Sequence, residues 1–186
     1  MKCVVVTGIP GVGKSTVLSA ALAKAESKFQ VVNFGDKMFE IAKRENLVSS
    51  RDEMRKLEPE VQKRIQRLAA RAIAEIAKRE NVVVDTHCTI KTPRGFLPGL
   101  PSWVLEELKP SRIVLIEASP EEIRERRAGD ETRQRDEDSV EEIELHQTMN
   151  RAMAMACAML TGATVEIVEN RTNMLEEAGD RLARCI

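Results

Sequence analysis

Short apolar runs alternate along the chain with longer stretches in which apolar residues recur every three or four positions. The short runs are rich in β-branched residues and predict five strands, at 4–6, 31–34, 82–84, 113–116 and 165–168. The longer stretches predict helices at 14–27, at 35–46, at 59–80, from 119 onward, at 139–160 and at 174–185. Nearly continuous apolar strands separated by helices are typical of a parallel sheet that is covered on both faces, so the pattern predicts an α/β fold.

Two of the predicted helices begin with the same capping sequence. Ser119 and Ser139 are each followed three residues later by a glutamate, Glu122 and Glu142, which is the spacing of a capping box. The segment 129–138, between these two helices, is polar. We therefore expect two well-defined helix starts with a short polar segment between the helices.

The totals for the 186 residues favour one domain, 1–186, that buries roughly 70% of the surface of the unfolded chain. The 29 basic and 30 acidic side chains nearly balance, and aromatic residues make up 3%, which argues against nucleic acid or an acidic membrane as a partner. The four cysteines are scattered without a C-x-x-C pair, so we expect neither a disulfide framework nor a structural zinc site. Because the first apolar stretch is far shorter than the about 20 residues of a membrane span, we expect a soluble cytoplasmic protein.

The stretch GIPGVGKST at 8–16 follows directly on the first predicted strand. It has the spacing G-x-x-x-x-G-K-[ST], in which inward-facing N–H groups and the start of the next helix hold phosphates, the lysine neutralises them and the hydroxyl binds Mg²⁺. A simple turn would need one glycine and would leave the lysine and the hydroxyl unexplained. The predicted ATP-binding residues are Gly8, Ile9, Pro10, Gly11, Val12, Gly13, Lys14, Ser15 and Thr16.

Asp85 ends the third predicted strand, where a P-loop protein places a carboxylate that holds Mg²⁺. We therefore predict that Ser15 and Asp85 serve the metal, Asp85 through water. A strand-end aspartate that caps a turn is the alternative. His87, two residues later, is interpreted either as a contact to a substrate phosphate or base, or as a loop side chain with its own hydrogen bonds.

Five arginines lie within the twelve residues 124–135. Phosphoryl transfer spreads negative charge over the equatorial oxygens, and arginines that close over the site stabilise it. We therefore predict a lid at about 128–138 and catalytic roles for Lys14, Arg126, Arg127, Arg133 and Arg135. A solvated charged segment is the alternative, since acidic residues are interspersed among the arginines.

These motifs together resemble the archaeal-type adenylate kinase family over essentially the whole chain. The matching stretches are GIPGVGKST at 8, VNFGDKMFE at 32, RDEMRKL at 51, VDTHCTIKTPRGFLPGLP at 84, TRQRD at 132 and HQTMNR at 146. The resemblance implies a P-loop NTPase-type three-layer α/β/α fold with a central five-stranded parallel sheet and a short lid. It also implies reversible, Mg²⁺-dependent transfer from ATP to AMP, giving two ADP for adenine nucleotide homeostasis, by a cytoplasmic enzyme that is commonly a homotrimer.

The resemblance further implies that helices at about 35–80 bind AMP. In many bacterial relatives an arginine of the first of these helices meets the AMP phosphate, but Phe39 occupies the corresponding position here. Arg55, Lys91 or Arg94 would then take over this task. Predicted AMP contacts are made by Gly35, Asp36, Arg55, His87 and Arg94.

Two other functions remain open from the residues alone. One is a kinase for another nucleoside monophosphate or for a small-molecule alcohol, which would need a base such as Asp36 or Asp85. The other is a nucleotide-switch ATPase; the chain has no N-K-x-D run to recognise guanine. For transfer to AMP we predict direct attack of the acceptor phosphate with no covalent enzyme intermediate, because that phosphate is already ionised and needs no base.

Overall fold

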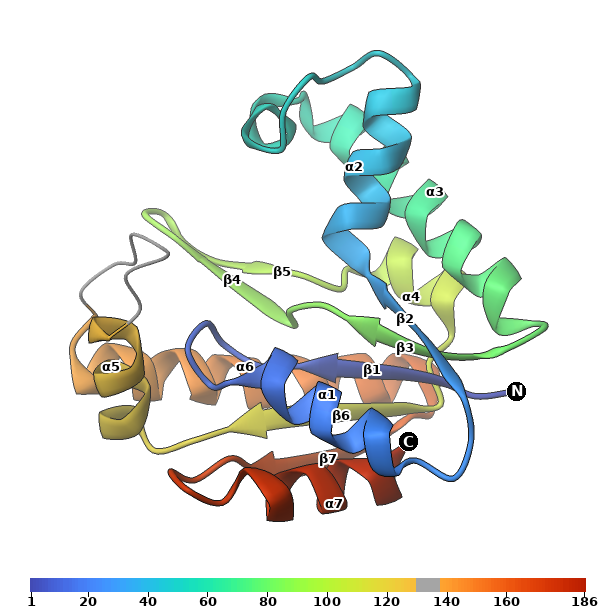
Figure 1. Ribbon diagram of the computed structural model, residues 1–186. Helices are drawn as coiled ribbons and strands as arrows, with labels where there is room; N and C mark the ends of the chain where they lie inside the picture. The colour runs from blue at the N-terminus through green and yellow to red at the C-terminus, as the bar shows by residue number, and fades with distance from the viewer. Residues whose placement is uncertain (130–137) are drawn as a thin grey trace.

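The computed structural model describes residues 1–129 and 138–186 (Figure 1). In chain order the elements are β1 (Cys3–Thr7), α1 (Lys14–Lys24), β2 (Phe29–Asn33), α2 (Phe34–Arg44), the 3₁₀ helix η1 (Asp52–Lys56), α3 (Pro59–Ala77), β3 (Asn81–Asp85), β4 (Thr89–Thr92), β5 (Gly95–Pro98), α4 (Ser102–Leu108), β6 (Arg112–Glu117), α5 (Pro120–Ala128), α6 (Val140–Thr161), β7 (Thr164–Glu169) and α7 (Leu175–Cys185).

A sheet with the strand order β2-β3-β1-β6-β7 forms the centre of the described part of the chain, and all of its strand pairs are parallel. β1 lies in the middle, where Val5 is the register partner of both Val84 and Ile113. The predicted five-stranded parallel sheet is therefore confirmed. Because the strands are parallel, the residues that follow β1, β3 and β6 all leave the sheet at the same edge.

The side chains of β1 alternate between two apolar cores. Val5 belongs to the core that also contains residues of α3, α4 and α6, whereas Val4 and Val6 belong to the core formed with α1 and α7. Figure 1 shows α1 and α7 on one side of the sheet and α6 on the other. The predicted three-layer α/β/α arrangement is confirmed.

Both predicted capping boxes are present. The Ser119 and Ser139 hydroxyls accept hydrogen bonds from the backbone N–H groups of Glu122 and Glu142, whose carboxylates accept the N–H groups of the serines in return. Phe34 belongs to α2 and not, as predicted, to the preceding strand. The reason is Asn33, whose side chain caps α2 by accepting the N–H of Asp36 at 3.0 Å.

Three short elements were not predicted from the apolar pattern: η1, α4 and the antiparallel hairpin of β4 and β5. In Figure 1 α2 and α3 form an arm that extends from the sheet, while α5 and the β4–β5 hairpin lie at the end of the sheet where β1 passes into the loop before α1. None of the helices within 1–129 and 138–186 is both long and apolar enough to cross a membrane.

Candidate active site

The loop between β1 and α1 has the backbone that the P-loop motif predicts. Gly11 and Gly13 have φ values of 95° and 80°, in the left-handed region that a residue with a Cβ rarely adopts. A Cβ at Gly13 would also lie 2.5 Å from Nδ2 of Asn170. Glycine at these two positions lets the backbone turn so that its N–H groups can face a phosphate.

Lys14, the first residue of α1, is held at the strand edge by β3. Its Nζ forms an ion pair with Asp85 and donates a hydrogen bond to the Thr86 carbonyl at 3.1 Å. The other carboxylate oxygen of Asp85 accepts a hydrogen bond from Nδ2 of Asn33 at 2.9 Å. The Lys14 and Asp85 side chains are only 11% and 16% exposed, so the predicted lysine and strand-end carboxylate do meet.

The donor set around Lys14 suits a metal that arrives with a nucleotide. Within the described residues there is no group of three or more His, Cys, Asp or Glu side chains able to hold a metal ion. Mg²⁺ typically uses one or two protein oxygens together with waters and substrate phosphates. Asp85 at the end of β3 and the exposed Ser15 in the first turn of α1 fit that mode of binding.

His87 supports the loop from the other side. Its Nδ1–H donates to the carbonyl of Gly8 at 2.9 Å. Burial lowers the pKa of His87, and the nearby charge of Lys14 lowers it further. His87 is therefore a neutral side chain with a hydrogen-bond partner in the P-loop, and its contact to AMP stays a prediction.

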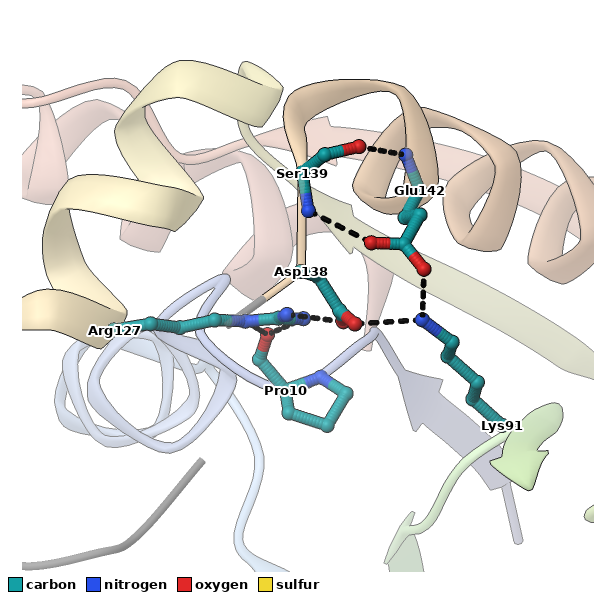
Figure 2. Close-up of polar contacts among 6 residues, drawn as sticks. All are labelled: Pro10, Lys91, Arg127, Asp138, Ser139 and Glu142. Atoms are coloured by element: carbon teal, nitrogen blue, oxygen red, sulfur yellow. Dashed lines mark hydrogen bonds and ion pairs between the residues drawn. The ribbon is translucent and has the colours of Figure 1, made fainter. Parts of the chain in front are cut away.

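The two described arginines of the predicted catalytic set reach the P-loop from α5. Arg126 donates to the carbonyl of Asn170 at 2.8 Å and to that of Val12 at 3.4 Å. Arg127 donates from both Nε and Nη2 to the carbonyl of Pro10, at 2.9 and 2.7 Å (Figure 2). The other two, Arg133 and Arg135, lie outside the described residues, as does most of the predicted lid.

Asp138 connects Arg127 to the β4–β5 hairpin. Its carboxylate accepts from Nη1 of Arg127 at 2.7 Å and from Nζ of Lys91 at 2.6 Å, and Lys91 also contacts Glu142 at 3.1 Å (Figure 2). Burial opposes ionisation of Asp138, but Lys91 and Arg127 outweigh burial and hold its pKa below the usual value. We call Lys91, Arg127, Asp138 and Glu142 the four-residue ion cluster.

The predicted acceptor residues are spread over two elements. Gly35 and Asp36 begin α2, and Asp36 pairs with Arg51 at 2.7 Å. Arg55 on η1 and Arg94 in the hairpin turn are exposed, and the side chain of neither forms a hydrogen bond or ion pair with another residue that the structure describes. The structure thus places Gly35 and Asp36 near Asp85, through Asn33, and leaves Arg55 and Arg94 at the surface.

Four residues of this region were given no individual role from the sequence: Asn33, Arg51, Asp138 and Asn170. Nδ2 of Asn170 donates to the carbonyl of Val12 at 2.8 Å, so the end of β7 supports the P-loop. Each of the two asparagines stands at the end of a parallel strand, which is a signal that could have been used. Arg51 was part of the RDEMRKL stretch, but Asp138 carried no comparable signal.

On the helix α6, Gln147 and Arg151 contact residues at or just after the end of β6. Arg151 pairs with Glu117 at 2.7 Å and with Glu144 at 3.2 Å. Gln147 donates to the Ala118 carbonyl at 3.1 Å. Arg151 is therefore held by two nearby glutamates.

Comparisons with known proteins show which proteins this chain resembles. A family model described as an AAA domain matches residues 7–144. Curated adenylate kinases of Methanothermobacter thermautotrophicus and Methanocaldococcus jannaschii are 60% and 58% identical, over 96% and 97% of this chain and 95% and 96% of their own. A shikimate kinase from Acinetobacter baumannii has the same fold, with a TM-score of 0.61 at 13% identity, over 100% of this chain and 92% of its own.

The fold, the P-loop and the strand-end carboxylate beside its lysine define a P-loop kinase, and the curated relatives show that it is one that acts on nucleoside monophosphates. Within that class, the chain belongs to the adenylate kinase family. Adenylate kinase activity is therefore its function.

Proposed function

We propose that this adenylate kinase transfers the γ-phosphoryl group of ATP directly to the phosphate of AMP, giving two ADP in a reversible reaction without a covalent enzyme intermediate. The observation that carries this proposal is the position of Lys14. Lys14 follows the P-loop and pairs with Asp85, and Asp85 in turn accepts a hydrogen bond from Asn33, at the start of α2. Transfer between two phosphates needs positioning and positive charge more than acid–base chemistry.

The donor half of the site follows from the P-loop. Residues Gly8 to Thr16 hold the triphosphate, and a bound triphosphate competes with Asp85 for Lys14. Ser15 and Asp85 would then hold Mg²⁺, Asp85 through water, and the metal neutralises phosphate charge when it is bound. Arg126 and Arg127 add positive charge from α5, and Arg133 and Arg135 belong to this proposal although they lie outside the described residues.

The nucleoside part of ATP would occupy a pocket of about 470 Å³ beside the start of α1. Its lining includes Gly13, Thr16, Arg126, Asn170 and Thr172. The pocket adjoins the P-loop at Gly13, so a nucleotide whose phosphates lie in the loop can extend its nucleoside into it. For the acceptor half we keep Gly35, Asp36, Arg55, His87 and Arg94 as the candidate AMP contacts.

We also propose a cytoplasmic homotrimer. The resemblance to archaeal-type adenylate kinases implies this state, and α6 supplies a surface for it. Large apolar side chains of α6 are exposed, among them Leu145 at 53%, Met155 at 59% and Met159 at 83%. Exposed apolar patches of this kind often mark interfaces between subunits.

The test of the proposed reaction measures ADP formation from Mg-ATP with AMP, CMP, UMP, GMP or no acceptor in parallel. We expect fast turnover with AMP and slow turnover without an acceptor. Preference for another monophosphate would move the acceptor assignment, and slow hydrolysis that is independent of acceptor would contradict the proposed transfer.

The matched variants for this assay are Lys14→Ala and Lys78→Ala. We expect Lys14→Ala to lose nearly all turnover, since one cation of the phosphate site is gone. Lys78 pairs with Glu75 on the surface of the molecule, where its side chain is 68% exposed, so Lys78→Ala should retain normal turnover. Thermal unfolding checks that both variants fold; near-normal turnover of a folded Lys14→Ala protein would overturn the site assignment.

A further inference from the structure

Arg51 precedes η1 and reaches back to the beginning of α2. Its Nη1 pairs with Oδ1 of Asp36 at 2.7 Å, and its Nη2 lies 3.4 Å from Oδ1 of Asn33. A Cβ at Gly35 would come within 2.7 Å of the same Nη2. The glycine of the FGD sequence at 34–36 therefore leaves room for the guanidinium group of Arg51.

Two side chains connect this guanidinium group to the P-loop lysine. Asn33 contacts Arg51 with its oxygen and donates from Nδ2 to Asp85 at 2.9 Å, and Asp85 forms the ion pair with Lys14. In direct transfer the attacking oxygen must come within about 3–3.5 Å of the γ-phosphorus. The acceptor phosphate must therefore lie close to Lys14, on the side where α2 begins.

A phosphate at this place needs a cationic side chain. The backbone N–H of Asp36, which could otherwise hold an anion at the start of α2, already donates to the Asn33 side chain at 3.0 Å. Arg51 has a planar set of N–H donors that matches phosphate oxygens in pairs. The side chain of Arg55, four residues further on, is exposed on η1 and forms no hydrogen bond or ion pair with another described residue.

We infer that Arg51 binds the phosphate of the acceptor nucleotide. When the acceptor arrives, the ion pair of Arg51 with Asp36 breaks and Arg51 pairs with the phosphate instead. The Arg51 and Asp36 side chains are 58% and 64% exposed, and ion pairs at such exposure are weak. A doubly charged phosphate therefore displaces the carboxylate, and Asp36 becomes free to face the nucleoside. This inference rests on the proposed transfer to a nucleoside monophosphate and names the residue that recognises its phosphate.

The experiment titrates AMP and adenosine into the wild-type protein and into Arg51→Ala by calorimetry, with competition titrations for weak ligands. Loss of hydrogen bonds to a charged group should weaken AMP binding about 10- to 100-fold, while adenosine, which has no phosphate, should bind as before. The affinity of the P-loop site for Mg-ATP should also be the same in Arg51→Ala as in the wild-type protein. Arg51→Lys should restore part of the AMP affinity because it restores the charge without the paired donors.

Arg64→Ala is the matched control, since Arg64 is also an exposed arginine of the α2–α3 arm, paired with Glu45 at 2.6 Å. We expect it to bind AMP normally. Equal AMP affinity in Arg51→Ala and wild type would overturn the inference, and so would a loss of adenosine affinity as large as the loss of AMP affinity. Weaker AMP binding in Arg55→Ala but not in Arg51→Ala would also overturn it. If the acceptor assay selects another monophosphate, the titration is repeated with that monophosphate and its nucleoside. The assay then tests AMP as the acceptor, and the titration separately tests Arg51 as the residue that binds the phosphate.

Discussion

His146 on α6 is a residue whose burial has a measurable consequence. Its side chain is buried, the residue being 3% exposed, and the ring packs against Phe96 with centroids 5.1 Å apart. Nε2 has no hydrogen-bond partner among the described residues. Burial lowers the pKa of His146 and the charge of Arg127 acts in the same direction, whereas a backbone hydrogen bond at Thr89 and the charge of Asp138 oppose it.

The stability of the protein should therefore fall as the pH drops below about 6.5, the ordinary pKa of histidine. In that range the unfolded chain binds a proton at His146 that the folded chain does not, so protonation favours unfolding. We expect His146→Asn to be less stable than wild type at pH 7.5, and the difference in unfolding free energy to shrink at pH 5.5. Urea unfolding at both pH values checks this; a difference that stays constant would contradict it.

Lys14 and Asp85 could be predicted from the sequence because each stands at a fixed position after a strongly apolar strand. Asn170 and Asn33 also stand at strand ends, which marks their positions, but their partners could not be predicted because they act through hydrogen bonds to segments far away in the chain. Asn170, for example, contacts Val12, 158 residues earlier. Such contacts are set by the sheet topology and can be assigned only once the strand order is known.

At the scale of elements, the four-residue ion cluster joins parts of the chain that the sheet does not connect. Arg127 belongs to α5 and also binds the P-loop carbonyl of Pro10, Lys91 belongs to β4, and Asp138 directly precedes the capping box of α6 (Figure 2). The Arg127 and Asp138 side chains are each 9% exposed. Two cations and two carboxylates thus balance, with Arg127 and Asp138 largely buried, while the Lys91 and Glu142 side chains are 30% and 51% exposed.

Asp138→Asn should destabilise the protein by about 1–3 kcal/mol, because it leaves Arg127 and Lys91 with less compensation for their charge. For a domain of this size, that lowers the unfolding temperature by roughly 2–4 °C per kcal/mol. The matched control is Asp180→Asn, which removes a 2.7 Å ion pair with Lys24 at a carboxylate that is 48% exposed. For Asp180→Asn we expect the unfolding free energy to change by less than about 1 kcal/mol. Equal losses of unfolding free energy in the two variants would show that the ion cluster stabilises the protein no more than an exposed ion pair does.

The large elements were predictable and the small ones were not, for a physical reason. Strands covered on both faces and helices with a capping serine carry long, repeated signals. The hairpin of β4 and β5 has strands of four residues, and Pro98 closes the second one. Proline and short length both argue against a strand when only the pattern is available, so this hairpin, which carries Lys91, was not expected.

At the scale of the whole molecule, α6 presents an apolar stripe that the described fold leaves uncovered. Leu145, Met149, Ala152, Ala156 and Met159 follow one another at spacings of four, three, four and three residues. This is the spacing of a seam along which a helix packs against another helix. All of these residues except Met149 are exposed, and Leu160 of the same helix and Ile167 of the neighbouring edge strand β7 add further exposed apolar side chains.

We therefore expect Met159→Glu to break the proposed trimer. Light scattering after size exclusion should give wild type a mass about three times the 20.8 kDa of the chain, and give the variant the mass of one chain. Since Met159 is 83% exposed, the substitution should not disturb the core of the subunit. Leu97→Glu, at an apolar residue of the β4–β5 hairpin that is 55% exposed, is the matched control and should retain the wild-type mass. A trimer that survives Met159→Glu but not Leu97→Glu would place the interface on the hairpin instead, and a wild-type mass of one chain would contradict the trimer itself.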